Sequence, residues 1–183
     1  MSPTTQEAPT AAPAAPAAAA RADDASVRRP AAIDHVCIIC SKGTLDGAYP
    51  ALVLANAARM SGISATLFFT FWGLDVITEK TVDRLQVATV GNPALHLPTI
   101  VGGVPGMAAM ATARMKKEME KLELPSVREM LQILSDSGAR LYGCKLAMDM
   151  FHRTRADLVP QVEEVITAMD FYDKAAGAQV IFV

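Results

Sequence analysis

Short apolar runs alternate along the chain with segments whose apolar residues recur at helical spacing. The first run, "VCIIC" (36–40), is unbroken and lies between polar residues, a pattern typical of a strand buried on both faces of a sheet. Helical spacing follows over 45–60, and Gly62 ends that helix. The aromatic-rich run 63–73 predicts a second strand. This β-α-β order indicates a parallel sheet.

An irregular insertion follows in the middle of the chain. Residues 74–85 predict a short helix, and the stretch from about 83 to 124 is so rich in Gly, Pro and Met that it predicts an insertion without regular structure. Ser126 and Glu129 then form a capping box at the start of a helix, which ends at Gly138.

The remaining chain returns to the alternation of strands and helices. Residues 139–144 predict a strand and 145–152 a short helix. A turn, a short extended piece and a helix are expected over 153–177, and 178–183 predict a last strand. The whole pattern predicts a small doubly wound α/β domain with one Gly/Pro/Met-rich insertion.

We expect residues 1–31 to form a disordered tail ahead of a domain that spans 32–183. After Met1, no large apolar side chain occurs until Val27, so this Ala/Pro-rich segment cannot bury enough surface to offset its ordering entropy. The alternative is a secretory or twin-arginine leader. Prolines interrupt the alanines, however, and no apolar stretch follows the Arg28-Arg29 pair.

Composition excludes several function classes. The 183-residue chain has a formal net charge of −2 and dispersed basic residues, which gives no nucleic-acid surface. Three cysteines, an odd number, argue against a disulfide framework and favour a reducing cytoplasm. The histidines lack zinc-site spacing and no phosphate-binding loop occurs, so we expect no metal and no cofactor.

The apolar insertion suggests contact with a membrane or a partner. Residues 95–113 have the length of a membrane span, but they include His96, two prolines and three glycines, which argues against a transmembrane helix. Methionine-rich surfaces repack easily around a partner. We therefore expect the insertion to contact a partner, a second subunit or the face of a bilayer.

The "CIIC" motif of Cys37 and Cys40 does not have the setting of a redox or zinc pair. On a strand, positions i and i+3 point to opposite faces, so the two thiols cannot easily share a disulfide or a metal. Cys37 is expected to be a buried small hydrophobe. Cys40 ends the strand beside a polar turn that includes Lys42 and Gly43, at the sheet edge where α/β proteins bind ligands. A functional and a structural role remain open for it.

Cys144 lies between a predicted strand and a predicted helix, with Lys145 next to it. Free N–H groups at a helix start and a nearby cation both stabilise a thiolate and lower a cysteine pKa. The structural alternative is a core cysteine that ends a buried strand, and position alone does not decide between the two. A thiolate–imidazole pair with His152 would require the chain to fold back.

Several stretches of the chain resemble the DsrE/DsrF-like family of sulfur-relay proteins, in particular a longer subgroup with an internal insertion that is often labelled a peroxiredoxin family. These stretches are "CSKGTLDGAYPALVLANAA", "FFTFWGLDVI", "GGVPGM", "LYGCKLAMDMF" and "AMDFYDKAAGAQVIFV". Together they cover nearly everything after residue 33. The peroxide-reducing Pro-x-x-x-Thr-x-x-Cys pattern is absent.

The resemblance implies a five-stranded, mostly parallel sheet flanked by helices, and a homo-oligomer. It further implies a cysteine that carries sulfur as a persulfide or thiosulfonate. Cys144 matches the position of that cysteine, and Cys40 that of a frequent second one. The residues expected to shape the site or bind a partner are Tyr142, Gly143, Lys145, Lys42 and Gly43. Relatives commonly work with a rhodanese and a TusA-like carrier in sulfur oxidation.

Three functions follow as hypotheses. The leading one is a cytoplasmic sulfur carrier or sulfurtransferase in which sulfur could pass between Cys144 and Cys40. The second is a non-catalytic protein that docks to a membrane or a complex through its insertion. The third is a thiol redox sensor that forms a Cys40–Cys144 disulfide.

Overall fold

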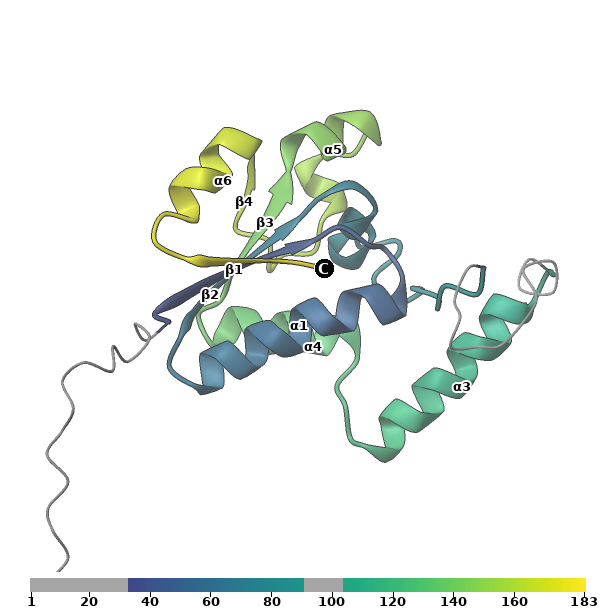
Figure 1. The fold of residues 1–183 in the computed structure, drawn as a ribbon. Helices are drawn as coiled ribbons and strands as arrows, with labels where there is room; N and C mark the ends of the chain where they lie inside the picture. The colour runs from purple at the N-terminus through teal and green to yellow at the C-terminus, as the bar shows by residue number, and fades with distance from the viewer. Residues whose placement is uncertain (1–32, 91–103) are drawn as a thin grey trace, which may run out of the picture. The chain divides into compact units, whose positions relative to one another are not determined.

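Five parallel strands form the centre of a computed structural model that describes residues 33–90 and 104–183 (Figure 1). The expected tail over 1–31 lies outside the described residues, as does part of the insertion. The strands are β1 (His35–Cys40), β2 (Ser64–Phe69), β3 (Arg140–Cys144), β4 (Glu164–Ile166) and β5 (Gln179–Phe182). Their order in the sheet is β4-β3-β2-β1-β5, and all four pairings are parallel, which confirms the predicted α/β class.

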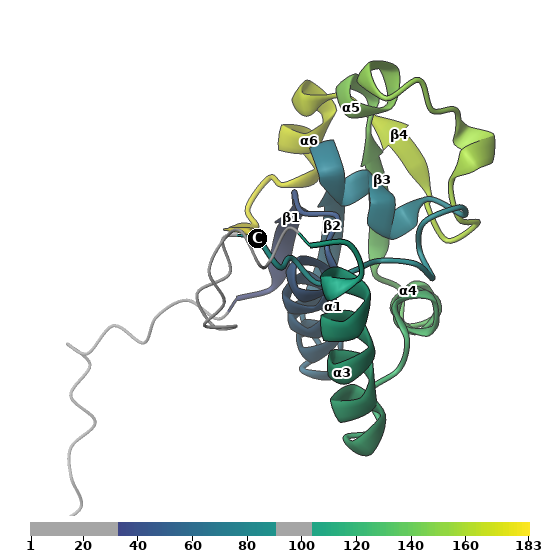
Figure 2. The same ribbon diagram turned by 90° about the vertical axis from the view of Figure 1, so that its right-hand side faces the viewer.

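Helices cover both faces of the sheet. Helices α1 (Leu45–Met60) and α4 (Val127–Asp136) lie on one face, and α5 (Lys145–Met150) and α6 (Ala168–Lys174) lie on the other (Figure 2). Two short 3-10 helices, η1 (Phe71–Ile77) and η3 (Arg155–Asp157), follow strand β2 and helix α5. A covered sheet explains why the strands are apolar at successive positions instead of at alternate ones.

The core lies between these layers. Ile38 on β1, Leu67 on β2 and Leu141 on β3 are almost completely buried. On the α6 side, the Phe68 ring packs against the Phe171 ring with centroids 4.9 Å apart. Burying one such large apolar side chain contributes about 1.5–3 kcal/mol, so these side chains together stabilise the packing of the helices on the sheet.

The predicted signals at both ends of α4 are confirmed. The Ser126 side chain accepts a hydrogen bond from the Glu129 backbone, and the Glu129 carboxylate accepts one from the Ser126 N–H at 2.8 Å. Gly138 has a φ of +83°, the left-handed conformation that commonly ends a helix. The chain then enters β3 directly.

Strand β2 ends earlier than the sequence predicts. The expected strand over 63–73 stops at Phe69, and Phe71 turns the chain with a φ of +46°. The prediction of a helix over 74–85 is also wrong. The helical segment is the 3-10 helix η1, which begins earlier, at Phe71, and ends at Ile77. Gly73 explains the tight path: a Cβ there would lie 2.1 Å from the Cys40 carbonyl oxygen. The end of β2 is thus folded back onto the end of β1.

The insertion contains a regular helix, contrary to the prediction. Helix α3 (Met107–Lys121) is composed largely of Ala, Met, Lys and Glu, which are strong helix formers. It buries only Thr112 and Met119, and the Val87 N–H donates to the Thr112 hydroxyl at 2.9 Å. Across residues 33–90 and 104–183, no helix is long and apolar enough to cross a membrane.

Candidate functional site at the carboxyl edge of the sheet

Cys144 is the last residue of β3 and immediately precedes α5. Its backbone is extended, with φ −77° and ψ 119°, and its side chain makes no capping hydrogen bond to the helix. The side chain is only 5% exposed. The thiol therefore lies at the predicted edge but beneath the surface, so a reaction with a partner protein requires it to become accessible.

Lys145, the expected neighbouring cation, is already paired. Its ammonium group lies 2.5 Å from an Asp149 carboxylate oxygen one turn further along α5. Both side chains are exposed to solvent, where such pairs are weak. The Lys145 ammonium group is therefore not an unpaired cation beside Cys144.

Cys40 is completely buried at the end of β1. Its thiol donates a 3.8 Å hydrogen bond to the Lys42 carbonyl oxygen. Burial raises the pKa of this thiol to about 11, and the Lys42 backbone and charge only partly offset that rise. Cys40 is therefore protonated at neutral pH in this conformation, and a protonated thiol is a poor nucleophile.

The register of the strands fixes how the two thiols are related. Cys40 lies opposite Phe69 on β2, and Phe69 lies opposite Gly143 on β3. Residues in register share a face of the sheet, so Cys144, one position after Gly143, points to the other face. Two strand spacings separate β1 from β3, so the Cα atoms of Cys40 and Cys144 lie about 10 Å apart. A disulfide needs about 4.4–6.8 Å, so the described conformation does not bring them into bonding distance.

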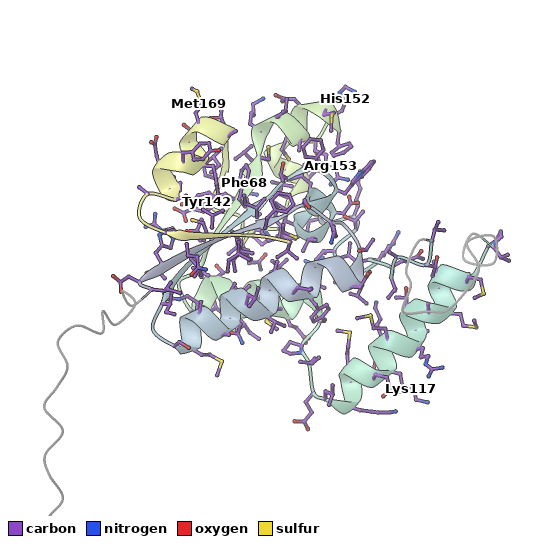
Figure 3. The ribbon with its side chains drawn as sticks, viewed as in Figure 1. Phe68, Lys117, Tyr142, His152, Arg153 and Met169 are labelled. Atoms are coloured by element: carbon purple, nitrogen blue, oxygen red, sulfur yellow. The ribbon has the colours of Figure 1, made fainter. Side chains whose placement is uncertain are left out.

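The other residues expected at the site lie in three different places. Lys42 is exposed at the carboxyl edge, and a Cβ at Gly43 would lie 2.4 Å from the Trp72 carbonyl oxygen, so Gly43 allows this loop to rest on η1. Gly143 faces Leu158 inside the protein instead of facing solvent. Tyr142 lies on the α6 side of the sheet (Figure 3) and is completely buried. The Lys174 ammonium group lies 5.3 Å from the centroid of its ring.

Cys37 is buried, as predicted, on the face opposite Cys40. Its sulfur lies 3.7 Å from the His35 ring and 3.8 Å from the Lys174 carbonyl oxygen. Burial raises the pKa of this thiol as well. No group of three or more His, Cys, Asp or Glu residues within the described ranges could hold a metal ion.

Comparison with known proteins identifies the family. The sequence profile of the DsrE/DsrF/DrsH-like family matches residues 33–183. The chain belongs to this family. A curated relative, the sulfur carrier protein DsrE2 of Allochromatium vinosum, is 33% identical over 134 residues, which cover 69% of this chain and 83% of that protein. The uncharacterized protein YrkE of Bacillus subtilis is 20% identical over 151 residues, 80% of this chain and 94% of that protein.

A solved structure supports the fold of this DsrE-like chain. The crystal structure of the YchN protein from E. coli matches it with a TM-score of 0.51 and 16% sequence identity, and the match covers 82% of this chain and 100% of that one. At this identity the likeness concerns the fold alone. The family predicted from the sequence is confirmed, and a sulfur-relay role for the DsrE-like chain has the support of the curated sulfur carrier.

Exposed apolar side chains at the carboxyl edge of the DsrE-like domain were not predicted as site residues. They come from η1 and α5: Phe71 is 50% exposed, Trp72 63%, Leu146 68% and Met150 49%. We call these four residues the edge patch. The "FFTFWG" run contains two aromatic residues directly after the end of a strand, and this could have indicated an exposed aromatic surface. The sequence alone does not show which of its aromatic side chains are buried and which are exposed.

An ion pair that the sequence did not predict ties η1 to the end of α5. The Arg153 guanidinium lies 2.5 Å from an Asp75 carboxylate oxygen and donates to the Thr78 hydroxyl at 2.7 Å. Trp72 also packs against Phe151, with ring centroids 4.8 Å apart. These contacts hold together the two elements that carry the edge patch.

Proposed function

We propose that this protein is a sulfur carrier that accepts sulfane sulfur or a thiosulfonate group on Cys144 and passes it to a thiol of a partner protein. Membership of the DsrE-like family and the similarity to a sulfur carrier support the general role. The observation that carries the assignment to Cys144 is its position at the end of β3, on the sheet edge that also bears the edge patch. Parallel α/β sheets bind their ligands at this edge.

The chemistry conserves electrons throughout. The Cys144 thiolate attacks the outer sulfur of a donor persulfide, a new S–S bond forms at Cys144, and the donor leaves as a thiolate. An acceptor thiolate then attacks the outer sulfur on Cys144, which regenerates the Cys144 thiolate. With tetrathionate as the donor, the same attack leaves a thiosulfonate on Cys144 and releases thiosulfate.

Access to Cys144 in this proposal comes from movement of α5. This helix has six residues and buries only Ala147 and Met148, so its displacement exposes little apolar surface. The edge patch then receives the partner, because exposed aromatic and methionine side chains are typical of protein-binding surfaces. We propose a cytoplasmic TusA-like carrier or a rhodanese as that partner and a homo-oligomer as the working form.

Cys40 has a secondary role in this proposal. Its burial and its distance from Cys144 argue against direct sulfur exchange between the two thiols in the described conformation. Cys40 receives sulfur only when the ends of β1 and β3 rearrange. Cys144 alone should therefore load first.

Intact mass spectrometry tests the proposal. The reduced full-length protein is incubated with polysulfide or tetrathionate, and its mass should rise by one sulfur or by one thiosulfonate group. Cys144→Ser should abolish this adduct, whereas Cys37→Ser should retain it as the matched control for a buried thiol on the same face. If Cys144→Ser loads as well as the unaltered protein, the proposal is wrong.

One observation favours docking through the insertion as a rival function. Helix α3 buries only two of its side chains and leaves Met110 62% exposed. Deletion of 93–115 should abolish association with a membrane or a partner and leave thiol loading unchanged if docking is the function. Retained association after this deletion would exclude that rival.

A further inference from the structure

A pocket lies at the amino-terminal edge of the sheet, at the opposite ends of the strands from Cys144. It has a volume of about 530 Å³ and is formed where β1, β2 and β3 begin beside the end of α6. The side chains with hydrogen-bonding groups that line it include His35, Thr66, Arg140, Tyr142 and Lys174. Pockets of this size bind small molecules in many proteins, and nothing in the proposed sulfur chemistry uses this one.

The Tyr142 hydroxyl is an unusual feature of this pocket. Tyr142 is completely buried, and its Oη atom has no hydrogen-bond partner among the described residues. The neighbouring Arg140 guanidinium, whose pKa the Tyr142 side chain raises, can only donate hydrogen bonds, so the hydroxyl hydrogen has no acceptor among the described residues. A buried hydroxyl without a partner is costly, and such groups in native proteins call for a specific explanation.

Two cations lie near the Tyr142 side chain. The Lys174 ammonium group lies 5.3 Å from the centre of the Tyr142 ring, and Arg140 lines the same pocket from the start of β3. Thr66 and His35 are already partners of each other, with 2.9 Å between Oγ1 and Nε2. The groups left for a ligand are therefore a hydroxyl donor and two cations, a set that suits an oxyanion.

Carboxylates limit the charge of that ligand. Asp34 and Asp173 also line the pocket, and Glu163 lies 4.0 Å from Arg140. Like charges disfavour a multiply charged anion, since each added negative charge meets these carboxylates at close range. A single negative charge on a small organic body fits both the two cations and the volume.

We propose that this pocket binds a small organic monoanion, with its carboxylate or sulfonate group held by the Tyr142 hydroxyl, Lys174 and Arg140. The site is separate from Cys144 and does not depend on sulfur transfer. The ligand supplies the acceptor that the Tyr142 hydroxyl lacks, and its organic part occupies the remaining volume.

Two buried tyrosines provide a matched test. The Tyr49 hydroxyl donates a 2.6 Å hydrogen bond to the Pro125 carbonyl oxygen, whereas the Tyr142 hydroxyl has no partner among the described residues. Without ligand, Tyr49→Phe should lower the melting temperature and Tyr142→Phe should not. With ligand, Tyr142→Phe should weaken binding about tenfold, because a hydrogen bond to a charged group is lost. Tyr49→Phe should leave binding unchanged.

Acetate, methanesulfonate and sulfate are the probes, titrated into the isotope-labelled full chain at constant ionic strength. We expect acetate and methanesulfonate to cause saturable NMR shifts at the amides of His35, Thr66 and Tyr142. Sulfate should cause weaker shifts at the same amides. Acetate and methanesulfonate distinguish a carboxylate from a sulfonate preference. Lys174→Gln should also weaken binding, with Lys121→Gln on α3 as the control for lost charge.

Three results would overturn this proposal. The first is the absence of saturable shifts with both monoanions. The second is tighter binding of sulfate than of either monoanion. The third is unchanged binding in both Tyr142→Phe and Lys174→Gln. If one of these variants folds poorly, unchanged binding in the other overturns the proposal.

Discussion

Cys40 and Cys144 end β1 and β3 at one edge of the sheet, with β2 between them, and point to opposite faces. We predict that mild peroxide or diamide does not join them by a disulfide in the folded protein, because the two Cα atoms are about 10 Å apart. Intact mass and peptide mapping after oxidation measure this. The unfolded chain, oxidised in parallel, should form disulfides among its three cysteines in several pairings and serves as the control. A rapid Cys40–Cys144 disulfide in the folded state would support the redox-sensor hypothesis instead.

The buried Cys40 thiol predicts a loss of stability at alkaline pH. Its folded pKa of about 11 lies above the ordinary value of 9.0, so the folded state holds this proton more tightly than the unfolded state. The resulting stabilisation is complete below pH 9 and is lost as the pH rises towards 11. Urea unfolding should reveal a loss on the order of 2 kcal/mol over this interval. Cys40→Ala should show a shallower decline, and equal slopes would contradict the prediction.

Gly73 and Gly143 provide a comparison of two glycines near the candidate site. Gly73→Ala places a Cβ 2.1 Å from the Cys40 carbonyl oxygen, a backbone atom that cannot move away easily. We expect this change to cost more than about 3 kcal/mol of unfolding free energy, in the range of severe steric changes. Gly143→Ala meets only side-chain atoms, the nearest being Leu158 at 3.4 Å, and should cost about 1 kcal/mol or less. Urea titration of both variants measures the difference.

Arg153 and Lys145 both form ion pairs close to α5, but the two pairs differ in their exposure to solvent. The Arg153–Asp75 pair is mostly buried, with side chains 21% and 25% exposed, whereas the Lys145–Asp149 pair is 53% and 60% exposed. Arg153→Met should therefore lower the unfolding free energy by about 2 kcal/mol, since it also leaves Asp75 without its partner. Lys145→Met should change it by about 0.5 kcal/mol at most. Similar losses in the two variants would contradict this assignment.

Trp72 should separate partner docking from sulfur loading. Its side chain is 63% exposed on the edge patch, so Trp72→Ala removes contact area for a protein but not the route for a small donor. We expect polysulfide to load Cys144 in this variant at the normal rate or faster, because loss of the Trp72–Phe151 contact loosens the end of α5. Transfer to a TusA-like acceptor should fall at least tenfold, as is common for an aromatic anchor. Met60→Ala, an exposed change at the end of α1, is the control.

Local signals along the chain predicted much of the fold. The unbroken run at 36–40 predicted a buried strand, and the Ser126–Glu129 pair predicted the start of α4; both are confirmed. Helix α3 was missed because the Gly, Pro and Met content of the insertion outweighed the helix-forming residues over 107–121. The early end of β2 was missed because apolar content cannot distinguish a strand from the apolar 3-10 turn that follows it.

The candidate site was harder to predict because it depends on strand order. The sequence placed Cys40 and Cys144 at strand ends, and that placement is correct. Their separation follows from β2 lying between β1 and β3 and from the register of three strands, which no local pattern contains. The burial of Tyr142 near Lys174 likewise depends on where α6 packs.

The pairing of β1 with β5 has a consequence for how the protein is made. The ribosome synthesises β1 early, but β1 gains its outer neighbour only after residues 179–182 have been added (Figure 1). Until then its hydrogen-bonding edge is open, and an open apolar edge can pair with another chain. Such distant pairing also slows folding, since a long loop must close first. A newly made chain therefore passes through a stage in which it can aggregate, and chaperones that shield strand edges should improve its yield.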